Sequence, residues 1–282
     1  METQTFTTEI GGKTLTATFT NLADQADGSV IMRYGNTTVL ITAVMGSRDR
    51  TDINYFPLSV EYEEKFYAAG QILGSRFIRR EGRPSDDAIL SARVVDRTIR
   101  PLFDHRLRKD VQVVVTVLSI EEDDPDVLGV NGASIALGCS SIPWSGPVSA
   151  VRIGKKKNSD EFVVNPTYNF RSADDTELDL LLCGQDNTIT MIEMHGNEVP
   201  EETLEAAFLF GAKELGNMQT FQKEIIAAIA KEKTALPEEP DTTDVETVFK
   251  KFSDEFEAVV FSGAPGKASM AELKQRYLDH IR

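Results

Sequence analysis

Apolar and polar residues alternate along the first part of the chain, a pattern that predicts β-strands. The alternation over 13–20 predicts one strand, and residues 55–63 predict a shorter one. Residues 28–45 predict two strands joined by a tight turn at Gly35-Asn36, where the apolar alternation is interrupted. The chain therefore begins with a β-rich region.

Further strands are predicted in the middle of the chain. Residues 111–120 are β-branched and nearly continuously apolar, which predicts a central strand covered on both faces. Shorter apolar segments predict the remaining strands, 147–154, 161–165, 178–184 and 188–195, with Asn187 in the turn between the last two.

Helical segments lie between these strands. Pro84-Ser85 opens a helix with acidic residues in its first turn, where carboxylates suit the helix dipole, and Pro101 marks its end near Arg100. Residues 129–141 are rich in small side chains and predict a helix that packs closely on a sheet. Together these elements predict an α+β fold.

The pattern changes after Pro200. Residues 199–233 predict a long helix, which is followed by an acidic, proline-rich linker over 234–244 and two more helices over 245–262 and 269–282. We therefore expect two domains, an α+β core over 1–235 that includes the long helix and an all-α segment over 236–282. The last helix has no stop signal, so we expect the chain to be a piece of a longer protein.

Composition is that of an ordinary globular protein, with 41% hydrophobic and 27% charged residues among 282. No apolar run approaches the roughly 18 residues of a membrane span, and the N-terminus lacks a signal-peptide pattern. Cys139 and Cys183 form no CxxC pair, which indicates reduced thiols in a cytoplasmic protein. The three histidines are widely spaced and match no metal-binding pattern, so we expect neither a zinc site nor a membrane partner.

Charge is distributed unevenly. The formal net charge is −15, yet residues 76–109 hold ten Lys and Arg against five Asp and Glu. That stretch therefore carries +5, and the remainder of the chain carries −20. A short basic stretch on an acidic body predicts a confined track for an anion rather than a broad nucleic-acid-binding face.

Three of these arginines belong to the helix that follows Ser85. Arg93, Arg97 and Arg100 lie within about 60° of one another on a helical wheel, so we expect them to form a row on one face. The opposite face should be aliphatic and buried, with Leu90, Val94, Val95, Ile99 and Leu102.

Arg79, Arg80 and Arg83 precede that helix on a loop, with Phe77 before them. Guanidinium groups bind phosphate oxygens in pairs, and an aromatic ring can stack on a base. The alternative is structural, because the arginines could pair with the chain's many acids and Phe77 could belong to the core. Charge and spacing alone leave both interpretations open.

The segment YAAGQILGSRFIRREGRPSDDAILSARVVDRTIRPLF, residues 67–103, resembles the first core of the bacterial polynucleotide phosphorylase family. GASIALGCSSIPWSGPV and LDLLLCG extend the resemblance to roughly residues 10–200, and the helices after Pro200 resemble that family's all-α linker domain. The resemblance implies an RNase PH-like core of the ribosomal-protein βα type. It also implies that two such cores form one chain and that three chains form a ring around a channel.

The resemblance also implies an activity. Enzymes of that family degrade single-stranded RNA from its 3′ end with inorganic phosphate and Mg²⁺, release nucleoside diphosphates, and can run in reverse. As a full-length protein we therefore expect a homotrimer that can join an RNA-degradation assembly.

The resemblance implies roles for the arginine segment. Phe77 would stack on RNA, and three arginines of the same loop would contact its backbone: Arg79, Arg80 and Arg83. The row on the helix would border the active site and its phosphate: Arg93, Arg97 and Arg100. Ile78 and Thr98 depart from the family's pattern, which has a second phenylalanine and a proline at these places.

The family's chemistry resides mainly in the second core, and the residues of this chain agree with that division. An active core carries phosphate-binding serines before its small-residue helix, whereas this chain has Asp123, Asp124 and Asp126, which would repel phosphate. An active core also has a lysine two residues after a metal-binding aspartate. Here Asp179 is followed by Leu181, so we expect that carboxylate to lack a cationic partner.

Asp174 and Asp175 lie upstream, in a stretch that favours a solvated charged loop over a metal site. We therefore expect no catalytic or metal-binding residue in this chain, with the Mg²⁺ ligands in a second RNase PH-like core.

The predicted function is thus the N-terminal part of a phosphorolytic 3′→5′ exoribonuclease, which guides RNA and supports the ring. Three alternatives stay open. One is a noncatalytic RNA-binding ring subunit of an RNase PH-like or exosome-like assembly, and another is a stand-alone RNase PH. The third is a small-molecule kinase, whose only candidate phosphate loop, GVNGAS, is better explained by helix packing.

Overall fold

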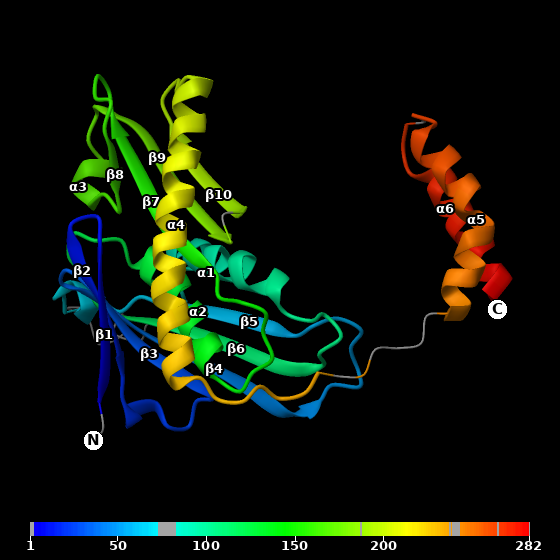
Figure 1. The fold of residues 1–282 in the computed structure, drawn as a ribbon, viewed down its shortest axis with the longest axis horizontal. Coiled ribbons are helices and arrows are strands. Elements are labelled where there is room, and N and C mark those ends of the chain that lie inside the picture. The colour runs from blue at the N-terminus through cyan, green and yellow to red at the C-terminus, as the bar shows by residue number, and fades with distance from the viewer. Residues whose placement is uncertain are drawn as a thin grey trace. The chain divides into compact units, whose positions relative to one another are not determined.

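The computed structural model describes residues 3–72, 83–186, 188–236, 238, 243–263 and 265–281. The chain forms two compact units, Met1–Leu236 and Pro237–Arg282. The larger unit holds two β-sheets and the helices packed on them (Figure 1), and it has the predicted α+β architecture.

The first sheet has six strands in the order β1-β2-β3-β4-β6-β5. Neighbouring strands are antiparallel except β5 and β6, which are parallel. The strands are β1 (Gln4–Ile10), β2 (Lys13–Phe19), β3 (Gly28–Tyr34), β4 (Thr37–Asp49), β5 (Leu58–Glu63) and β6 (Lys109–Ser119).

The predicted hairpin at Gly35 is confirmed, and this glycine adopts a φ of 58°, which glycine tolerates best. β1 was not predicted, because most of its side chains are polar or exposed at the edge of the sheet.

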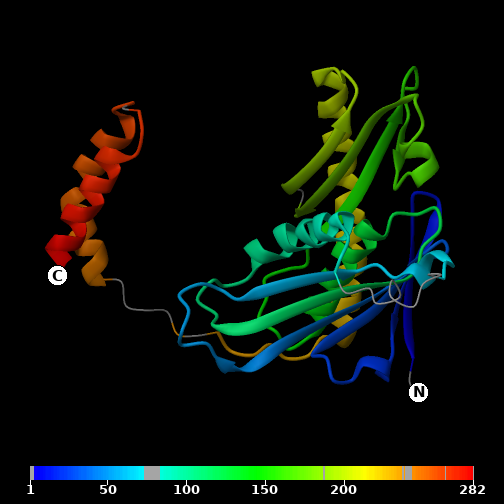
Figure 2. The same ribbon diagram turned by 180° about the vertical axis from the view of Figure 1, so that it is seen from behind.

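Strand β6 corrects the prediction of a doubly covered strand. Val111, Val113, Val115 and Val117 are buried, whereas the side chains between them are exposed or half-buried. The helices cover only one face of this sheet (Figure 2), so the alternate β-branched residues lie on its open face.

The second sheet has four antiparallel strands in the order β10-β9-β7-β8. Its strands agree with the predicted segments: β7 (Ser149–Lys156), β8 (Phe162–Val164), β9 (Thr176–Gln185) and β10 (Thr188–Gly196). The short helix α3 (Tyr168–Arg171) connects β8 to β9. Residues 178–184 of β9 are all buried, so this strand has the double coverage predicted for β6.

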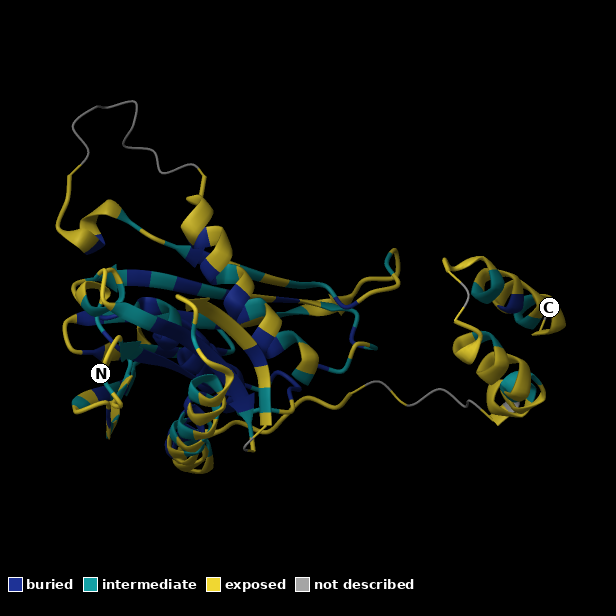
Figure 3. Ribbon diagram, turned by 90° about the horizontal axis from the view of Figure 1, so that it is seen from above, coloured by how far each residue is buried: buried dark blue, intermediate teal, exposed yellow. Residues whose placement is uncertain are grey.

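Helix α2 (Pro125–Cys139) joins the two sheets, because it contacts β3 and β4 on one side and β7 and α4 (Glu201–Ile229) on the other. Nearly all of its residues are buried, as the dark core in Figure 3 shows. A Cβ on Gly132 would lie 2.3 Å from Cδ1 of Ile41. Gly132 of GVNGAS therefore serves helix packing, as predicted.

A buried amide network fixes α4 against α2 and β7. Gln222 is fully buried and donates from Nε2 to Oδ1 of Asn131 at 2.9 Å and to the carbonyl oxygen of Val148 at 3.0 Å. Its Oε1 accepts a hydrogen bond from the hydroxyl of Ser134. Because these groups satisfy one another, α4 has one orientation on the core.

Helix α1 (Asp86–Ile99) has the predicted ends. The hydroxyl of Ser85 caps it by accepting from the N–H of Ala88 at 3.0 Å, and a 3₁₀ turn follows at Arg100–Leu102. Leu90 was placed on the buried face, but it is 60% exposed. It lies seven residues before Arg97 and therefore on the same exposed face.

The smaller unit contains the two predicted helices, α5 (Thr243–Phe261) and α6 (Ala268–Ile281). They pack through aromatic rings, such as Phe252 and Tyr277, whose centroids are 5.6 Å apart. Among the described residues of both units, no helix is long and apolar enough to cross a membrane.

Candidate functional site

Ion pairs divide the arginine row predicted on α1. Arg97 lies 3.5 Å from Glu193 of β10, between Nη1 and Oε1. Arg100 instead holds Asp96 with two hydrogen bonds, at 2.6 Å from Nη2 and 3.0 Å from Nε. Arg93 makes no ion pair with any residue that the structure describes. Arg93 is therefore the member of the row whose guanidinium group is most available to an external anion.

A surface depression of about 1190 Å³ lies between α1 and β5. Arg83, Arg93 and Arg100 line it, whereas Arg97 does not. Its charged lining also includes Glu61, Glu63, Glu64, Lys65 and Asp96. The depression offers the guanidinium groups of Arg83 and Arg93 to an anion, whereas Asp96 already holds Arg100. Acids of β5 and the following turn offset this positive charge.

The end of the arginine loop is fixed at the depression. Arg83 is exposed, and two residues later the hydroxyl of Ser85 donates to Oε2 of Glu64 at 3.0 Å. Phe77, Arg79 and Arg80 lie outside the described residues.

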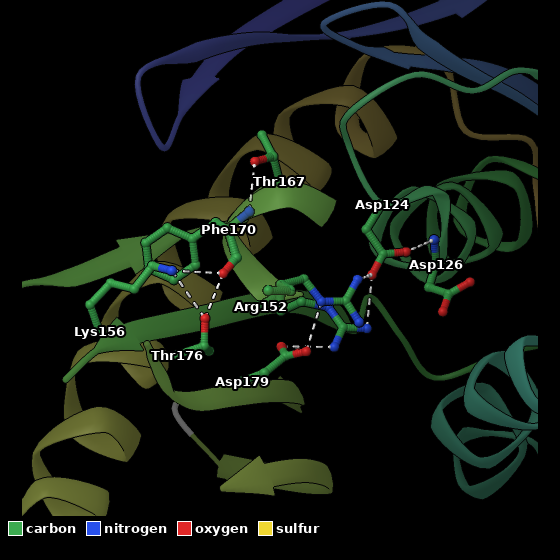
Figure 4. A network of polar contacts seen from close by, with 9 residues as sticks. Asp124, Asp126, Arg152, Lys156, Thr167, Phe170, Thr176 and Asp179 are labelled. Carbon is green, nitrogen blue, oxygen red and sulfur yellow. Dashed lines mark hydrogen bonds and ion pairs between the residues drawn. The ribbon is translucent and has the colours of Figure 1, made fainter. Parts of the chain in front are cut away.

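A second group of charges lies at the N-terminal end of α2 (Figure 4). We call it the α2 charge cluster, and it consists of Asp124, Arg152, Arg171 and Asp179. Oδ2 of Asp124 lies 2.9 Å from Nη2 of Arg152 and 2.6 Å from Nη1 of Arg171. Asp179 contacts the same two arginines. Its Oδ1 lies 3.0 Å from Nη1 of Arg152, and its Oδ2 lies 2.7 Å from Nε of Arg171.

The α2 charge cluster is nearly closed to solvent. The side chains of Asp124, Arg152 and Asp179 keep only 6%, 9% and 10% of their exposure. Burial alone would lower the pKa of Arg152, but Asp124 and Asp179 raise it above its ordinary value. The buried Arg152 and the half-buried Arg171 therefore compensate the two carboxylates, as charges withdrawn from solvent must be compensated.

This arrangement corrects the prediction that Asp179 has no cationic partner, because Asp179 has two. Leu181 does stand where the lysine was sought, but Arg152 reaches Asp179 from the neighbouring strand and Arg171 from α3. The sequence analysis missed both arginines. A signal was present, since Arg152 is the single charge in the apolar segment 147–154 and such residues are rarely buried without a partner.

The other carboxylates near α2 also have fixed roles. Asp123 accepts from Nζ of Lys13 at 2.6 Å. Asp174 and Asp175 are exposed, and Asp175 pairs with Lys156, in line with the predicted solvated loop.

The α2 charge cluster does not fit a magnesium ion. Oδ1 of Asp124 accepts the N–H of Asp126 at 2.8 Å, and every other carboxylate oxygen of the cluster faces an arginine. Mg²⁺ requires free oxygen ligands in octahedral geometry. In the described residues, no group of three or more His, Cys, Asp and Glu could hold a metal ion.

The ionised form of Asp126, which lies beside the cluster, is disfavoured. Burial and then the negative charge of Asp124 raise its pKa to about 6. The folded state therefore holds a proton that the unfolded chain releases, and stability falls as pH rises from about 4 to about 6.

We expect Asp126→Asn to remove this loss. At pH 7.5 the variant should gain on the order of 1–3 kcal/mol in free energy of unfolding, with no gain at pH 4. Urea titrations at both pH values measure the difference. Asp175→Asn is the control, because its partner Lys156 lowers the pKa of Asp175. This variant should therefore lose free energy of unfolding at pH 7.5, whereas Asp126→Asn gains it. A gain for Asp126→Asn that is equal at both pH values would contradict the assignment.

The 3′ exoribonuclease family matches through its domain 1 over residues 12–143 and its domain 2 over residues 146–214. Over 250 residues, the chain is 43% identical to a polyribonucleotide nucleotidyltransferase of Heliobacterium modesticaldum, covering 88% of this chain and 35% of that protein. A Bacillus cereus protein of the same name is 38% identical, covering 99% of this chain and 39% of that protein.

The chain thus spans about a third of the length of the curated relatives it matches. Among solved structures, rice Rrp46 has the same fold, with a TM-score of 0.58 at 14% identity over 80% of this chain and 94% of that one. Because both domain models match in order and together cover most of the RNase PH-like unit, the chain belongs to the 3′ exoribonuclease family.

Proposed function

We propose that this chain is the N-terminal part of a phosphorolytic 3′→5′ exoribonuclease and that it guides RNA and supports a ring of subunits. A second RNase PH-like core would carry out the reaction, in which phosphate attacks the terminal phosphodiester and releases a nucleoside diphosphate. That core would hold the Mg²⁺ ligands, and the full-length protein would be a cytoplasmic homotrimer within an RNA-degradation assembly. Family membership and the two buried, free thiols support this proposal.

One observation carries the division of labour. The carboxylate of Asp124 occupies the N-terminal end of α2 and uses the guanidinium groups of Arg152 and Arg171. An incoming phosphate would find neither an open helix N-terminus nor an unpaired cation there, and it would meet two carboxylates. In the described residues, the N-terminal end of α2 therefore lacks the anion clamp that phosphoryl transfer needs.

Guidance of RNA is assigned to the depression beside α1. Arg83, Arg93 and Arg100 would face the phosphates of a single strand, as guanidinium groups do in tracks that follow a nucleic-acid backbone. Arg97 is paired with Glu193 of β10, does not line the depression, and would border the shared active site instead.

The test is a phosphorolysis assay with RNA binding measured in parallel. The purified chain is mixed with end-labelled oligoadenylate, Mg²⁺ and phosphate, and released diphosphate is counted. We expect salt-sensitive binding without product, and we expect product once the chain is extended by a second core. Phosphate-dependent release by this chain alone would overturn the proposal.

The binding arm of this test uses Arg79→Glu/Arg80→Glu. We expect RNA affinity to fall about tenfold or more, and the dependence of log K on log salt to flatten by about 1.4, because two phosphate contacts are lost at about 0.7 each on a single strand. Arg50→Glu/Arg276→Glu changes the net charge equally at exposed sites that are distant from the loop in sequence, and it should have little effect. Equal losses of RNA affinity in both variants would show that the effect depends on net charge alone.

The α2 charge cluster, whose charges are all paired, is also compatible with a second function, a noncatalytic RNA-binding ring subunit. The extended chain separates the two, since a noncatalytic subunit gives no product in any length or assembly.

A further inference from the structure

Helices α5 and α6 form a hairpin that buries little of its own apolar surface. The hydroxyl of Tyr277 donates to the carbonyl oxygen of Val245 at 3.4 Å, and the rings of Phe252 and Tyr277 pack edge to face. Of the described residues in this smaller unit, only Leu273 is buried, and Figure 3 shows most of the hairpin as exposed.

A unit of this size is completed by disulfides, by a metal or by association. The sequence after Pro237 contains no cysteine. Its described residues contain no group of three or more His, Cys, Asp and Glu that could hold a metal ion. Association with a further apolar surface is therefore the way in which this hairpin can gain a core.

The exposed apolar side chains of α5 form a stripe, which we call the α5 stripe. Its four members keep 41–49% of their exposure: Val245, Phe249, Phe256 and Val260. They follow one another at spacings of four, seven and four residues, which places them on one face of the helix. The rings of the two phenylalanines are 5.9 Å apart, so the stripe is continuous along the helix.

The α5 stripe has the same order of residues in both directions. Valines stand at its ends and phenylalanines inside, and both pairs are centred between residues 252 and 253. When a second copy of α5 lies antiparallel on the first, Val245 therefore meets Val260 of the second copy, and Phe249 meets Phe256. An interface between identical copies requires this reciprocity, in which residue i contacts j and j contacts i.

Charge also favours the antiparallel arrangement. The dipoles of the two helices then oppose each other, whereas in a parallel pair their like ends lie together. Lys250 and Glu257 are exposed on the same flank of the α5 stripe. In the antiparallel pair, Lys250 of each copy comes opposite Glu257 of the other, so two ion pairs border the apolar contact.

We infer that the α5 stripe is a docking surface for a second copy of this chain. The two hairpins form a four-helix bundle about a two-fold axis, with their α5 helices antiparallel. A two-fold contact cannot close a ring of three, so this contact is distinct from the ring of the proposed function.

The first test is the molar mass of the full chain, measured by light scattering at about 100 μM, where even a weak contact is populated. We expect Phe249→Glu/Phe256→Glu to halve the association number, because pairing would then bury carboxylates. Thr247→Glu/Ala258→Glu adds the same charge on the opposite, exposed face of α5 and should leave the mass unchanged. A monomeric unmodified chain, or equal masses for the two double variants, would overturn the inference.

Cross-linking tests the orientation without the glutamate variants, whose hairpin could unfold. Val245→Cys and Val260→Cys each place a small apolar thiol at one end of the α5 stripe, and the native Cys139 and Cys183 are buried. A short bis-maleimide should cross-link a mixture of the two variants. Each variant alone should not react, because like positions lie about 22 Å apart along antiparallel helices.

Cross-linking of either variant alone, or none in the mixture, would contradict the antiparallel contact between two copies. Both readouts are association rather than RNA turnover, so their outcome does not depend on the proposed function.

Discussion

Replacing Arg152 with alanine should lower the free energy of unfolding of the larger unit by about 3–5 kcal/mol. The variant leaves Asp124 and Asp179 buried, with Arg171 as their remaining cation in the α2 charge cluster. An uncompensated buried carboxylate is among the most destabilising defects that a single substitution can create. Urea unfolding followed by Trp144 fluorescence measures the loss.

Two comparisons separate this effect from loss of packing. Arg97→Ala removes an exposed arginine paired at 3.5 Å, so it should cost at most about 1 kcal/mol. Arg152→Ala/Asp179→Asn should be less destabilising than the sum of the single variants, because the orphan charge disappears with its partner. Additive losses of stability, or a loss for Arg152→Ala as small as that for Arg97→Ala, would show that the charges of the cluster do not compensate one another.

Gly28→Ala should destabilise the larger unit by about 2–3 kcal/mol, because it overpacks the contact between β3 and α2. A Cβ at this position would lie 2.2 Å from the carbonyl oxygen of Ala136 and 2.9 Å from Cβ of Ser140. The first clash is with backbone, so either the strand or the end of α2 must shift. The same urea titration measures the effect.

Gly46→Ala in β4 is the matched control. Its added Cβ would meet nothing closer than 3.5 Å, and the glycine has an ordinary φ, so stability should stay the same or rise slightly. Equal stability of Gly28→Ala and Gly46→Ala would mean that α2 can move away from β3 at little cost.

Much of the fold follows from local patterns. The ends of α1 were predictable because Ser85 caps the helix through its own neighbour Ala88 and Pro101 stops it. The hairpin at Gly35 was predictable for the same reason, since a tight turn depends on a few adjacent residues.

Local patterns failed where coverage by distant elements decides burial. The valines of β6 are compatible with a strand that is covered on both faces or on one face. Only the placement of α1 and α2 on the same face of the sheet decides between these two cases. The prediction that Leu90 is buried was wrong, because on the helical wheel Leu90 lies beside Arg97 and not on the opposite face.

The sequence by itself determined the element types, the small-residue character of α2 and the local excess of arginine, because each depends on neighbouring residues. It could not determine the charge partners. Asp179 meets Arg152 only because β7 and β9 pair in one register, and Arg171 only because α3 turns back toward them. Strand register and helix placement are set by burial of the whole core, so only the tertiary structure decided that the end of α2 is closed.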